Sequence, residues 1–179
     1  MKNVLIISSS LRRGSNSEAL AKEFARGASD AGNKVELISL RDKDIRFCRG
    51  CLACQKTQKC VIADDAQAIV AKMHDADVIV FATPIYYYEM SGQLKTLLDR
   101  ANPLYPSDYR FRDIHMLTSA AEDEESTPER AVMGLTGWID CFGKASLAGT
   151  IFAGGVNDPN EIDGHAALAE AYSVGNKIQ

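Results

Sequence analysis

The chain has 179 residues, a formal net charge of −4, 46% hydrophobic residues and 25% charged residues. This is ordinary globular composition, and the length suits one domain, because single cores are commonly built from roughly 100 to 200 residues. The acidic balance argues against a nucleic-acid partner, since phosphate-backbone binding depends on clustered Lys and Arg. We find neither a signal-peptide core nor a run of about 20 apolar residues, so we expect a cytoplasmic protein without a membrane partner.

Five short apolar runs predict five β-strands. Four of them are continuous, as expected of parallel strands that are covered on both faces, and one alternates like an edge strand. The continuous runs are residues 4–7, 78–81, 114–117 and 147–152, and the alternating run is residues 35–40.

Segments with helical periodicity separate these strands. Ser15 and Glu18 form a Ser-x-x-Glu capping box at the start of the first helix, which we expect to end at Asp30, before Gly32. The other helices are expected to start at Asp64 or Asp65, at Ser91, at Thr127 with Pro128 in the first helical position, and at about Gly164. This alternation predicts an α/β fold, a three-layer doubly wound sheet with right-handed crossovers.

Ligands of such sheets bind beyond the carboxyl ends of the strands, and two loops expected there are unusual. The first, SSSLRRGSNSEAL, gathers hydroxyls, N–H groups and two guanidiniums before a helix N-terminus. It predicts a phosphate site of the mononucleotide type, because G-x-G-x-x-G and the P-loop pattern are both absent. In the second, Pro84 and the tyrosines at residues 86–88 offer aromatic surface for a flat ring. The alternatives are a polar turn with an ordinary N-cap, and tyrosines that pack in the core or between copies of the chain.

Four of the five cysteines stand close together. Cys48, Cys51, Cys54 and Cys60 have the spacing C-x2-C-x2-C-x5-C, whose first part matches bacterial ferredoxin runs while its last gap is longer. A reducing compartment disfavours structural disulfides. An iron–sulfur cluster, free or redox-active thiols, and zinc are the alternatives that remain, and zinc is the least favoured because its ligand pairs usually stand farther apart. Cys141 is predicted to be a core thiol.

Taken together, four segments resemble the NAD(P)H-dependent FMN reductase family and its iron–sulfur flavoprotein branch. They are SSSLRRGSNSEAL, CRGCLACQKTQKCVIADD, ATPIYYYEMSGQLKTLLDR and LAEAYSVGNKI. The resemblance implies a flavodoxin-like, five-stranded parallel sheet of order 2-1-3-4-5, in one FMN-binding domain over residues 1–179 with a cysteine-rich loop at residues 48–60. Ser9 and Leu11 depart from the frequent glycine and proline, so the first turn is expected to differ in detail.

The resemblance also implies where FMN would bind. The phosphate would lie in the first loop, the flavin ring over the loop after the third strand, and the pyrimidine side of the flavin against the loop after the fourth. The residues are Ser10, Arg12, Ser15, Asn16 and Ser17 for the phosphate, Pro84, Ile85, Tyr86 and Tyr87 for the ring, and Thr118 and Ser119 for the pyrimidine side.

The implied function is an FMN-dependent oxidoreductase that takes hydride from NAD(P)H and reduces a small acceptor, such as a quinone, a flavin, or a nitro or azo compound. Flavin N5 carries this chemistry, so no side chain is assigned as catalytic, and His74, His115 and His165 are expected to be structural or surface residues.

Two alternative functions use the cysteines. One is an iron–sulfur flavoprotein electron carrier, in which a four-iron cluster on these cysteines exchanges electrons with FMN and a protein partner. The other is a thiol-based redox sensor. In every case we expect the cysteine loop to lie beside the flavin crevice, with Cys51 and Cys54 as its interior pair, and the chain to form a homodimer or homotetramer.

Overall fold

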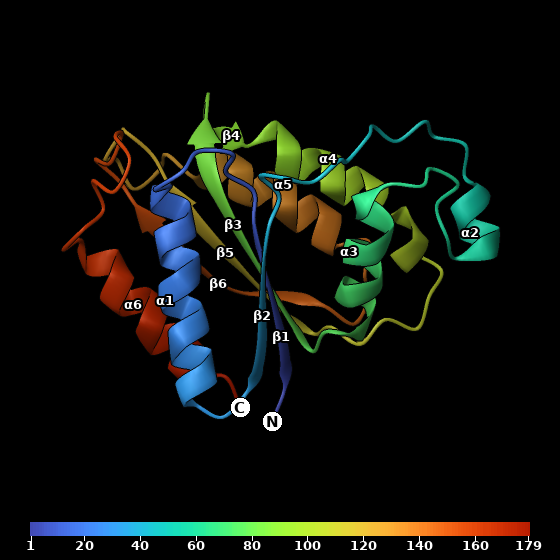
Figure 1. Ribbon diagram of the computed structural model, residues 1–179, viewed down its shortest axis with the longest axis horizontal. Coiled ribbons are helices and arrows are strands. Elements are labelled where there is room, and N and C mark those ends of the chain that lie inside the picture. Colours follow the sequence, from blue (N-terminus) through green and yellow to red (C-terminus); the bar gives the residue numbers. More distant parts are fainter.

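The computed structural model describes residues 1–179 as a sheet between two layers of helices (Figure 1). Its parallel strands follow the order β2-β1-β3-β5-β6, which is 2-1-3-4-5 when these five are numbered along the chain, as predicted. They are β1 (Asn3–Ser8), β2 (Lys34–Ser39), β3 (Val78–Tyr86), β5 (Asp113–Ser119) and β6 (Ser146–Ala153). The sequence did not predict β4 (Glu89–Met90), a short strand that pairs antiparallel with the end of β3.

Helices cover both faces of the sheet (Figure 1). One face is covered by α1 (Asn16–Asp30) and α6 (Ala166–Asn176), and the other by α3 (Asp65–Asp75), α4 (Gly92–Arg100) and α5 (Glu129–Ile139). The predicted helix starts lie within a few residues of the observed ones. Two short elements were not predicted: α2 (Ala53–Thr57), inside the cysteine loop, and the 3-10 turn η1 (Asn102–Leu104) after α4.

Side-chain caps explain where the helices begin. The Ser15 hydroxyl accepts the Glu18 N–H at 3.4 Å, and the Asp64 carboxylate accepts the Ala66 N–H at 3.1 Å. The reciprocal half of the predicted capping box is absent, because the Glu18 carboxylate pairs with Arg41 instead.

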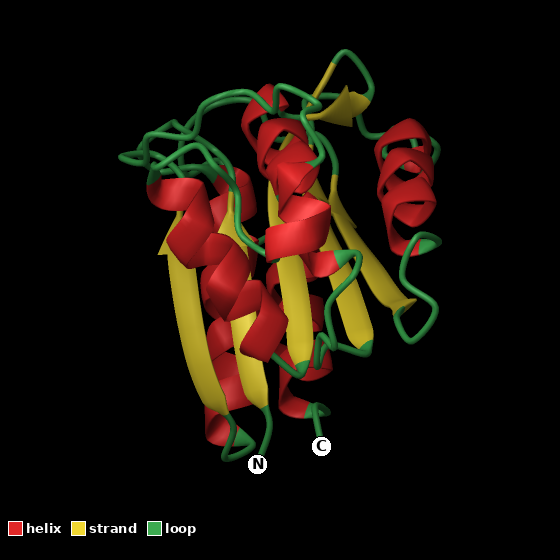
Figure 2. Cartoon of the chain, turned by 90° about the vertical axis from the view of Figure 1, so that its right-hand side faces the viewer, coloured by secondary structure: helices red, strands yellow, loops and turns green.

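Alternate residues of each central strand feed two separate cores. In β1, Leu5 and Ile7 pack toward α3, α4 and α5, whereas Val4 and Ile6 pack toward α1 and α6. Both faces are therefore buried, which is why the strand reads as a continuous apolar run. The loops that follow the strands gather at the end of the molecule opposite the two chain termini (Figure 2).

Candidate functional site

A cavity of about 330 Å³ lies at the carboxyl ends of the strands, where doubly wound sheets bind ligands. Nine of the eleven residues predicted to contact FMN line it, and Ser17 and Thr118 do not. The lining comprises Ser10, Arg12, Ser15, Asn16, Pro84, Ile85, Tyr86, Tyr87, Tyr88, Ser119, Ala120, Ala121, Glu122, Val156 and Asn157.

One wall of the cavity is built by the loop between β1 and α1. Ser10 is buried, and its hydroxyl accepts the Arg12 N–H at 3.3 Å, while Ser15 caps α1. The Arg12 guanidinium donates to the Asn157 carbonyl, so the loop is tied to the segment that follows β6. Hydroxyls, a guanidinium and the positive end of a helix dipole thus share one wall, and together they favour an anion.

Three of the predicted site residues use their side chains within the protein. Asn16 lines the cavity, but its amide donates to the Asp158 carbonyl at 3.0 Å and accepts the Ile162 N–H at 3.3 Å. The Ser17 hydroxyl is fully buried against that of Ser15, and the Thr118 hydroxyl donates to the Ile151 carbonyl at 3.2 Å. These side chains hold the walls of the cavity in place.

The opposite wall is aromatic. Strand β3 continues to Tyr86, and Tyr87 and Tyr88 form the two-residue turn into β4. Both turn residues have positive φ, at 51° and 65°, as a type I′ hairpin requires. Tyr87 is 99% exposed, whereas the Arg130 guanidinium lies 5.5 Å from the centre of the Tyr88 ring. The hairpin therefore holds one tyrosine against the protein and presents the other at the rim.

A buried hydroxyl network joins the two walls. The Ser9 hydroxyl donates to the Ala82 carbonyl at 3.2 Å and lies 2.8 Å from the Ser91 hydroxyl, which donates to it. The Ser91 N–H donates to the Thr83 hydroxyl at 3.0 Å. Ser9, one of the two departures from the family pattern, thus links the first loop to the start of α4.

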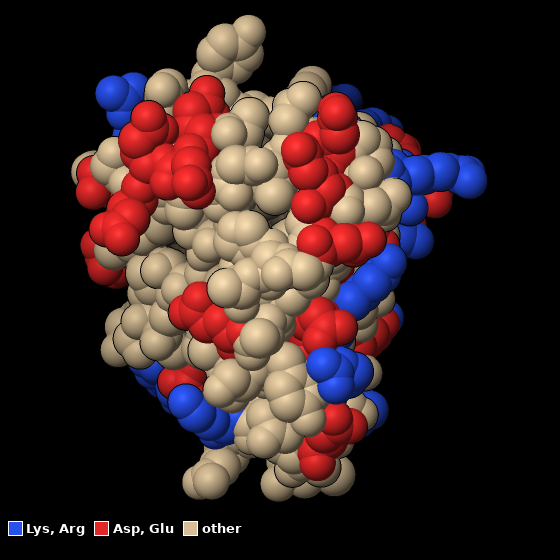
Figure 3. Space-filling model, turned by 90° about the vertical axis from the view of Figure 1, so that its left-hand side faces the viewer, with Lys and Arg blue, Asp and Glu red and all other residues tan.

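The sequence offered no signal for the part of the cavity that follows β6. Val156 and Asn157 belong to an irregular segment without a recognisable motif. The Glu161 carboxylate holds this segment by accepting the N–H groups of Asp158 and Asn157, at 2.8 and 2.6 Å, and these bonds lower the Glu161 pKa. Glu122 also lines the cavity, and its carbonyl accepts the Gly155 N–H of the same segment at 3.2 Å. Figure 3 shows acidic side chains spread over one face of the molecule, with the two largest groups in its upper half.

None of the three histidines lines this cavity. His74 is partly exposed and contacts Asp75 at 2.7 Å, His165 caps α6 by accepting the Ala167 N–H, and His115 is buried in β5. None of the helices has the length and apolar run that a bilayer crossing requires.

The cysteines line a different cavity, of about 310 Å³. All five face it, together with Leu98, Trp138 and Phe142, and no residue is shared with the first cavity. The cysteine loop packs over the end of α4, whereas the start of α4 lies beside the β3–β4 hairpin (Figure 1). At 1.5 Å per residue, this helix separates the two regions by about 13 Å. The cysteine loop thus lines a cavity of its own toward the other end of α4, and it shares no wall with the crevice.

Two expectations about the thiols are corrected by the structure. Cys54 lies in α2 and is buried, whereas Cys51 precedes this helix and is exposed, so the two do not form an interior pair. Cys141 is exposed and follows the end of α5, where Ile139 and Phe142 occupy the core-facing positions. Cys60 is partly buried and Cys48 is exposed.

The four thiols of the motif line one cavity without converging on a point. No three His, Cys, Asp or Glu side chains converge as one metal ion requires. A four-iron cluster takes one thiolate at each iron, so its ligands surround a volume rather than a point. Donors already lie near two sulfurs: the Asn102 amide is 3.2 Å from Cys54 Sγ, and the Gly50 N–H is 3.4 Å from Cys48 Sγ. Four thiols around one mostly apolar cavity are the donor type that such a cluster would use.

Comparison with known proteins agrees with this arrangement. The family model of NADPH-dependent FMN reductases matches residues 2–135. An iron–sulfur flavoprotein of Methanocaldococcus jannaschii is 41% identical over 101 residues, which cover 56% of this chain and 52% of that protein. An iron–sulfur flavoprotein of Methanosarcina thermophila is 27% identical over 159 residues, which cover 88% of this chain and 83% of that protein. The match thus spans about half the length of the first relative.

Solved structures share the fold. A NAD(P)H:quinone oxidoreductase from Methanothermobacter marburgensis superposes with a TM-score of 0.74 at 17% identity, covering 99% of both chains. An azoreductase from Bacillus anthracis gives a TM-score of 0.74 at 18% identity, covering 99% of this chain and 100% of that one. The flavodoxin-like architecture, the crevice at its strand ends and the match of the family model lead to one conclusion: the chain belongs to the NADPH-dependent FMN reductase family.

Proposed function

We propose that the protein is an FMN-dependent oxidoreductase that accepts hydride from NAD(P)H and passes electrons to a small acceptor. The observation that carries this proposal is the cavity at the strand ends. Its two walls combine an anion-binding helix N-terminus with an aromatic surface, as a flavin mononucleotide needs. Membership of the family supports the same reading.

The residues of the cavity fit FMN in two parts. Ser10, Ser15 and Arg12, with the N-terminus of α1, would hold the phosphate by hydrogen bonds and charge. Pro84 and Tyr86 would orient the flavin ring from the other wall. Bound FMN supplies the hydride-accepting centre, and the chain contributes orientation and exclusion of water around it.

The acceptor is proposed to be a flat, small molecule such as a quinone, a free flavin, or a nitro or azo compound. The rim of the cavity supports this choice, because Tyr87 is almost fully exposed there and offers an aromatic face. A relative from Bordetella bronchiseptica is named an FMN-dependent NADH:quinone oxidoreductase, and it is 30% identical over 109 residues, which cover 55% of this chain and 52% of that protein.

Stopped-flow mixing tests hydride transfer directly. The protein is loaded with FMN and mixed anaerobically with NADH or NADPH, and loss of the oxidised flavin absorbance is followed. We expect at least one nicotinamide to bleach the flavin, and the flavin to be reoxidised when a quinone is added. Bleaching by dithionite, with neither nicotinamide effective, would contradict the proposal and favour a pure electron carrier.

A second candidate function adds an iron–sulfur cluster. One cavity is lined by Cys48, Cys51, Cys54 and Cys60, and several relatives of this chain carry the name iron–sulfur flavoprotein. We propose that these four thiols hold a four-iron cluster, which would relay electrons between FMN and a protein partner.

Two expectations about the whole chain stay predictions. Two apolar cores on the faces of a single sheet support one domain over residues 1–179. Association into a homodimer or homotetramer is supported by apolar side chains left exposed, since Leu11, Tyr87 and Met133 are 47%, 99% and 70% exposed.

A further inference from the structure

One buried arginine joins both ends of the cysteine loop. Arg100, the last residue of α4, is only 2% exposed. Its Nη1 donates to the Arg46 carbonyl at 2.6 Å, and its Nη2 donates to the Ile62 carbonyl at 3.1 Å. Arg46 precedes Cys48 and Ile62 follows Cys60, so a single guanidinium fixes the entry and the exit of the loop.

Asp64 pairs with Arg100, and we call these two side chains the clasp of the cysteine loop. Its two carboxylate oxygens accept from Arg100 Nη1 and Nη2, at 2.6 and 2.9 Å, and both side chains are fully buried. Asp64 also accepts the Arg46 N–H at 2.9 Å and caps α3. A buried pair of charges persists only where hydrogen bonds compensate both ions, and here almost every bond goes to a stem of the cysteine loop.

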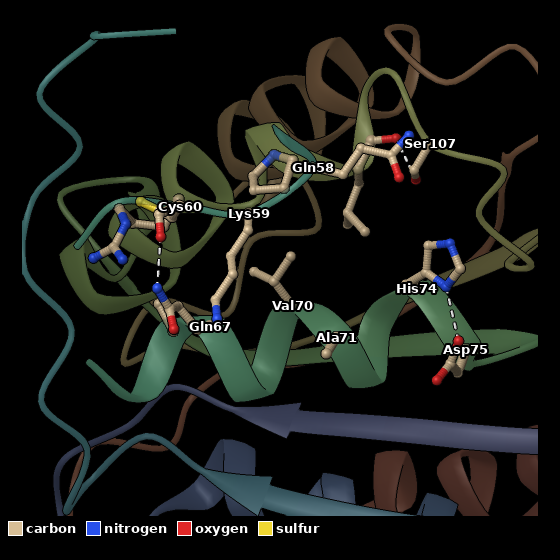
Figure 4. Close-up of a pocket in the computed structure, with 13 residues that line it drawn as sticks. Gln58, Lys59, Cys60, Gln67, Val70, Ala71, His74, Asp75 and Ser107 are labelled. Carbon is tan, nitrogen blue, oxygen red and sulfur yellow. Dashed lines mark hydrogen bonds and ion pairs between the residues drawn. The ribbon is translucent and has the colours of Figure 1, made fainter. Parts of the chain in front are cut away.

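One donor of the guanidinium is left over. Arg100 Nε is buried and has no hydrogen-bond partner within the protein. Arg100 and Cys60 line the same cavity of about 360 Å³. The bond to Asp64 raises the Arg100 pKa most, burial opposes this shift, and Cys60 adds to it. The Cys60 carbonyl is held in turn by the Gln67 amide at 2.5 Å (Figure 4). An unpaired buried N–H is costly, so a free donor at the cavity that Cys60 lines indicates a role for Arg100 beyond its bonds to Asp64 and the loop stems.

A neighbouring residue repeats the arrangement. Asn102, in η1, donates its amide N–H to Cys54 Sγ at 3.2 Å. Of the two least exposed thiols of the loop, Cys54 thus contacts Asn102 in η1, and Cys60 shares a cavity with Arg100 at the end of α4, whereas Cys48 and Cys51 are exposed.

We propose that Arg100 and Asn102 are positioning residues of the cysteine loop. From the end of α4 and from η1, these two side chains fix Cys60 and Cys54 and direct N–H groups at their sulfurs. The contacts themselves do not depend on a metal. Their consequence for a bound cluster rests on the proposed iron–sulfur role. N–H groups directed at ligand sulfurs stabilise added negative charge, so they raise a cluster's reduction potential.

Side-chain NMR of the reduced, metal-free protein tests the contact at Cys60. The Nε–H signal of Arg100 is identified by its loss in Arg100→Lys. We expect Cys60→Ala to shift this signal and Cys51→Ala to leave it in place. An unchanged Arg100 signal in Cys60→Ala would overturn the contact. Because the Cys60→Ala variant keeps Arg100, this measurement does not depend on how well Arg100→Lys folds.

Amide hydrogen exchange of the same protein tests the clasp. We expect Arg100→Lys, which keeps the charge but cannot reproduce the fork, to speed exchange across residues 46–62 by at least tenfold. The control is Lys56→Gln, which removes an exposed cation on α2 and should leave these amides unchanged. Equal protection in Arg100→Lys and the wild type would overturn the positioning role.

Reconstitution with ferrous iron and sulfide tests the electronic consequence. We expect the cluster potential of Asn102→Leu and of Arg100→Lys to be more negative than that of the wild type, with Lys56→Gln unshifted. Unshifted potentials in both variants would overturn the tuning. If the wild type takes up no iron, the iron–sulfur proposal fails, whereas the positioning role is still decided by the NMR and exchange measurements.

Discussion

At the scale of single residues, burial decides whether a charged side chain is free to bind a ligand or is paired within the fold. Arg12 is exposed at the rim of the crevice, where its guanidinium can meet an incoming anion. Arg100 is buried with its carboxylate partner and serves the fold. Removing one member of a buried pair typically costs about 3 to 5 kcal/mol, because the other charge is left unpaired, whereas an exposed arginine can be replaced at little cost in stability.

The first prediction concerns Arg12. We expect Arg12→Ala to weaken FMN binding by about 1.5 to 3 kcal/mol, the range for hydrogen bonds to charged groups, and to leave riboflavin binding unchanged. Titration of flavin fluorescence measures both affinities. Arg13→Ala is the matched control, since Arg13 is exposed and does not line the cavity. Equal FMN affinity in Arg12→Ala and the wild type would show that the phosphate lies elsewhere.

The second prediction concerns His115. This side chain is 6% exposed, and its ring centre lies 5.2 Å from that of Phe24. Burial lowers its pKa, and the Asp113 charge opposes the shift only in part. Below pH 6.5 the unfolded chain therefore binds a proton that the folded chain does not. The free energy of unfolding falls as the pH is lowered, until the folded pKa is reached.

Urea denaturation at pH 7, 6 and 5 checks this sign. We expect the wild type to lose stability over this interval, and His115→Leu to lose less. His74→Gln is the control, because His74 is partly exposed on α3. The pKa values of Asp64 and Asp77 are also lowered in the folded protein, so these carboxylates contribute to the free energy of unfolding. That contribution is lost only near and below their ordinary pKa of 3.8, outside this pH interval. A slope that is the same in His115→Leu would rule out this histidine as its source.

At the scale of elements, the hairpin between β3 and β4 is strained. Its turn is of a type that favours Asn-Gly, yet Tyr87 and Tyr88 occupy the two positions with positive φ. A non-glycine residue in this region costs about 1 to 2 kcal/mol. Such strain tends to persist at functional sites. We therefore interpret the two tyrosines as residues whose aromatic surface serves ligand binding in the cavity that they line.

The prediction at this scale replaces the turn. We expect the double substitution Tyr87→Asn with Tyr88→Gly to stabilise the flavin-free protein by about 1 to 2 kcal/mol, and to weaken FMN binding through loss of aromatic surface. Urea denaturation and FMN titration measure the two effects. Tyr105→Asn, which changes an exposed tyrosine outside this cavity, is the control. A variant that is both less stable and unchanged in FMN affinity would contradict the interpretation.

At the scale of the whole molecule, the two cavities occupy opposite ends of α4 and share no residue. The flavin proposal uses the strand ends, and the cluster proposal uses the loop over the end of the helix. Loss of one group is therefore expected to leave the other in place.

Flavin, iron and sulfide assays on anaerobically purified protein check this independence. We expect Cys54→Ser to lose iron and sulfide while keeping FMN at the wild-type ratio. Cys141→Ser should keep all three, because Cys141 lines the same cavity but stands outside the four-cysteine motif. Parallel loss of flavin and iron in Cys54→Ser would contradict separate sites, and a wild type without iron would leave the thiols free for a redox-sensing role.

Local pattern by itself predicted the strands, the helix starts and the doubly wound class of this protein, whereas the strand order and most residues of the crevice lining were implied by the family resemblance. Apolar periodicity predicted the five parallel strands, and caps such as Ser15 and Ser91 predicted the helix starts, because these signals depend on neighbours within a turn or two. Loops that follow parallel strands must meet at one edge of the sheet, so Ser10 and Tyr86 could be assigned to one cavity from the order of elements alone.

Only the tertiary structure decided which cysteine is buried, where the cysteine loop lies and what holds it. Cys51 and Cys54 have similar sequence surroundings, and the contact of Cys54 with Asn102 is set by packing between segments 48 positions apart. The clasp of Arg100 on Asp64 joins positions 36 apart. Contacts of this kind have no period and no fixed spacing in the sequence. They depend on how whole helices and loops pack against one another, and the packing of the complete core determines that arrangement.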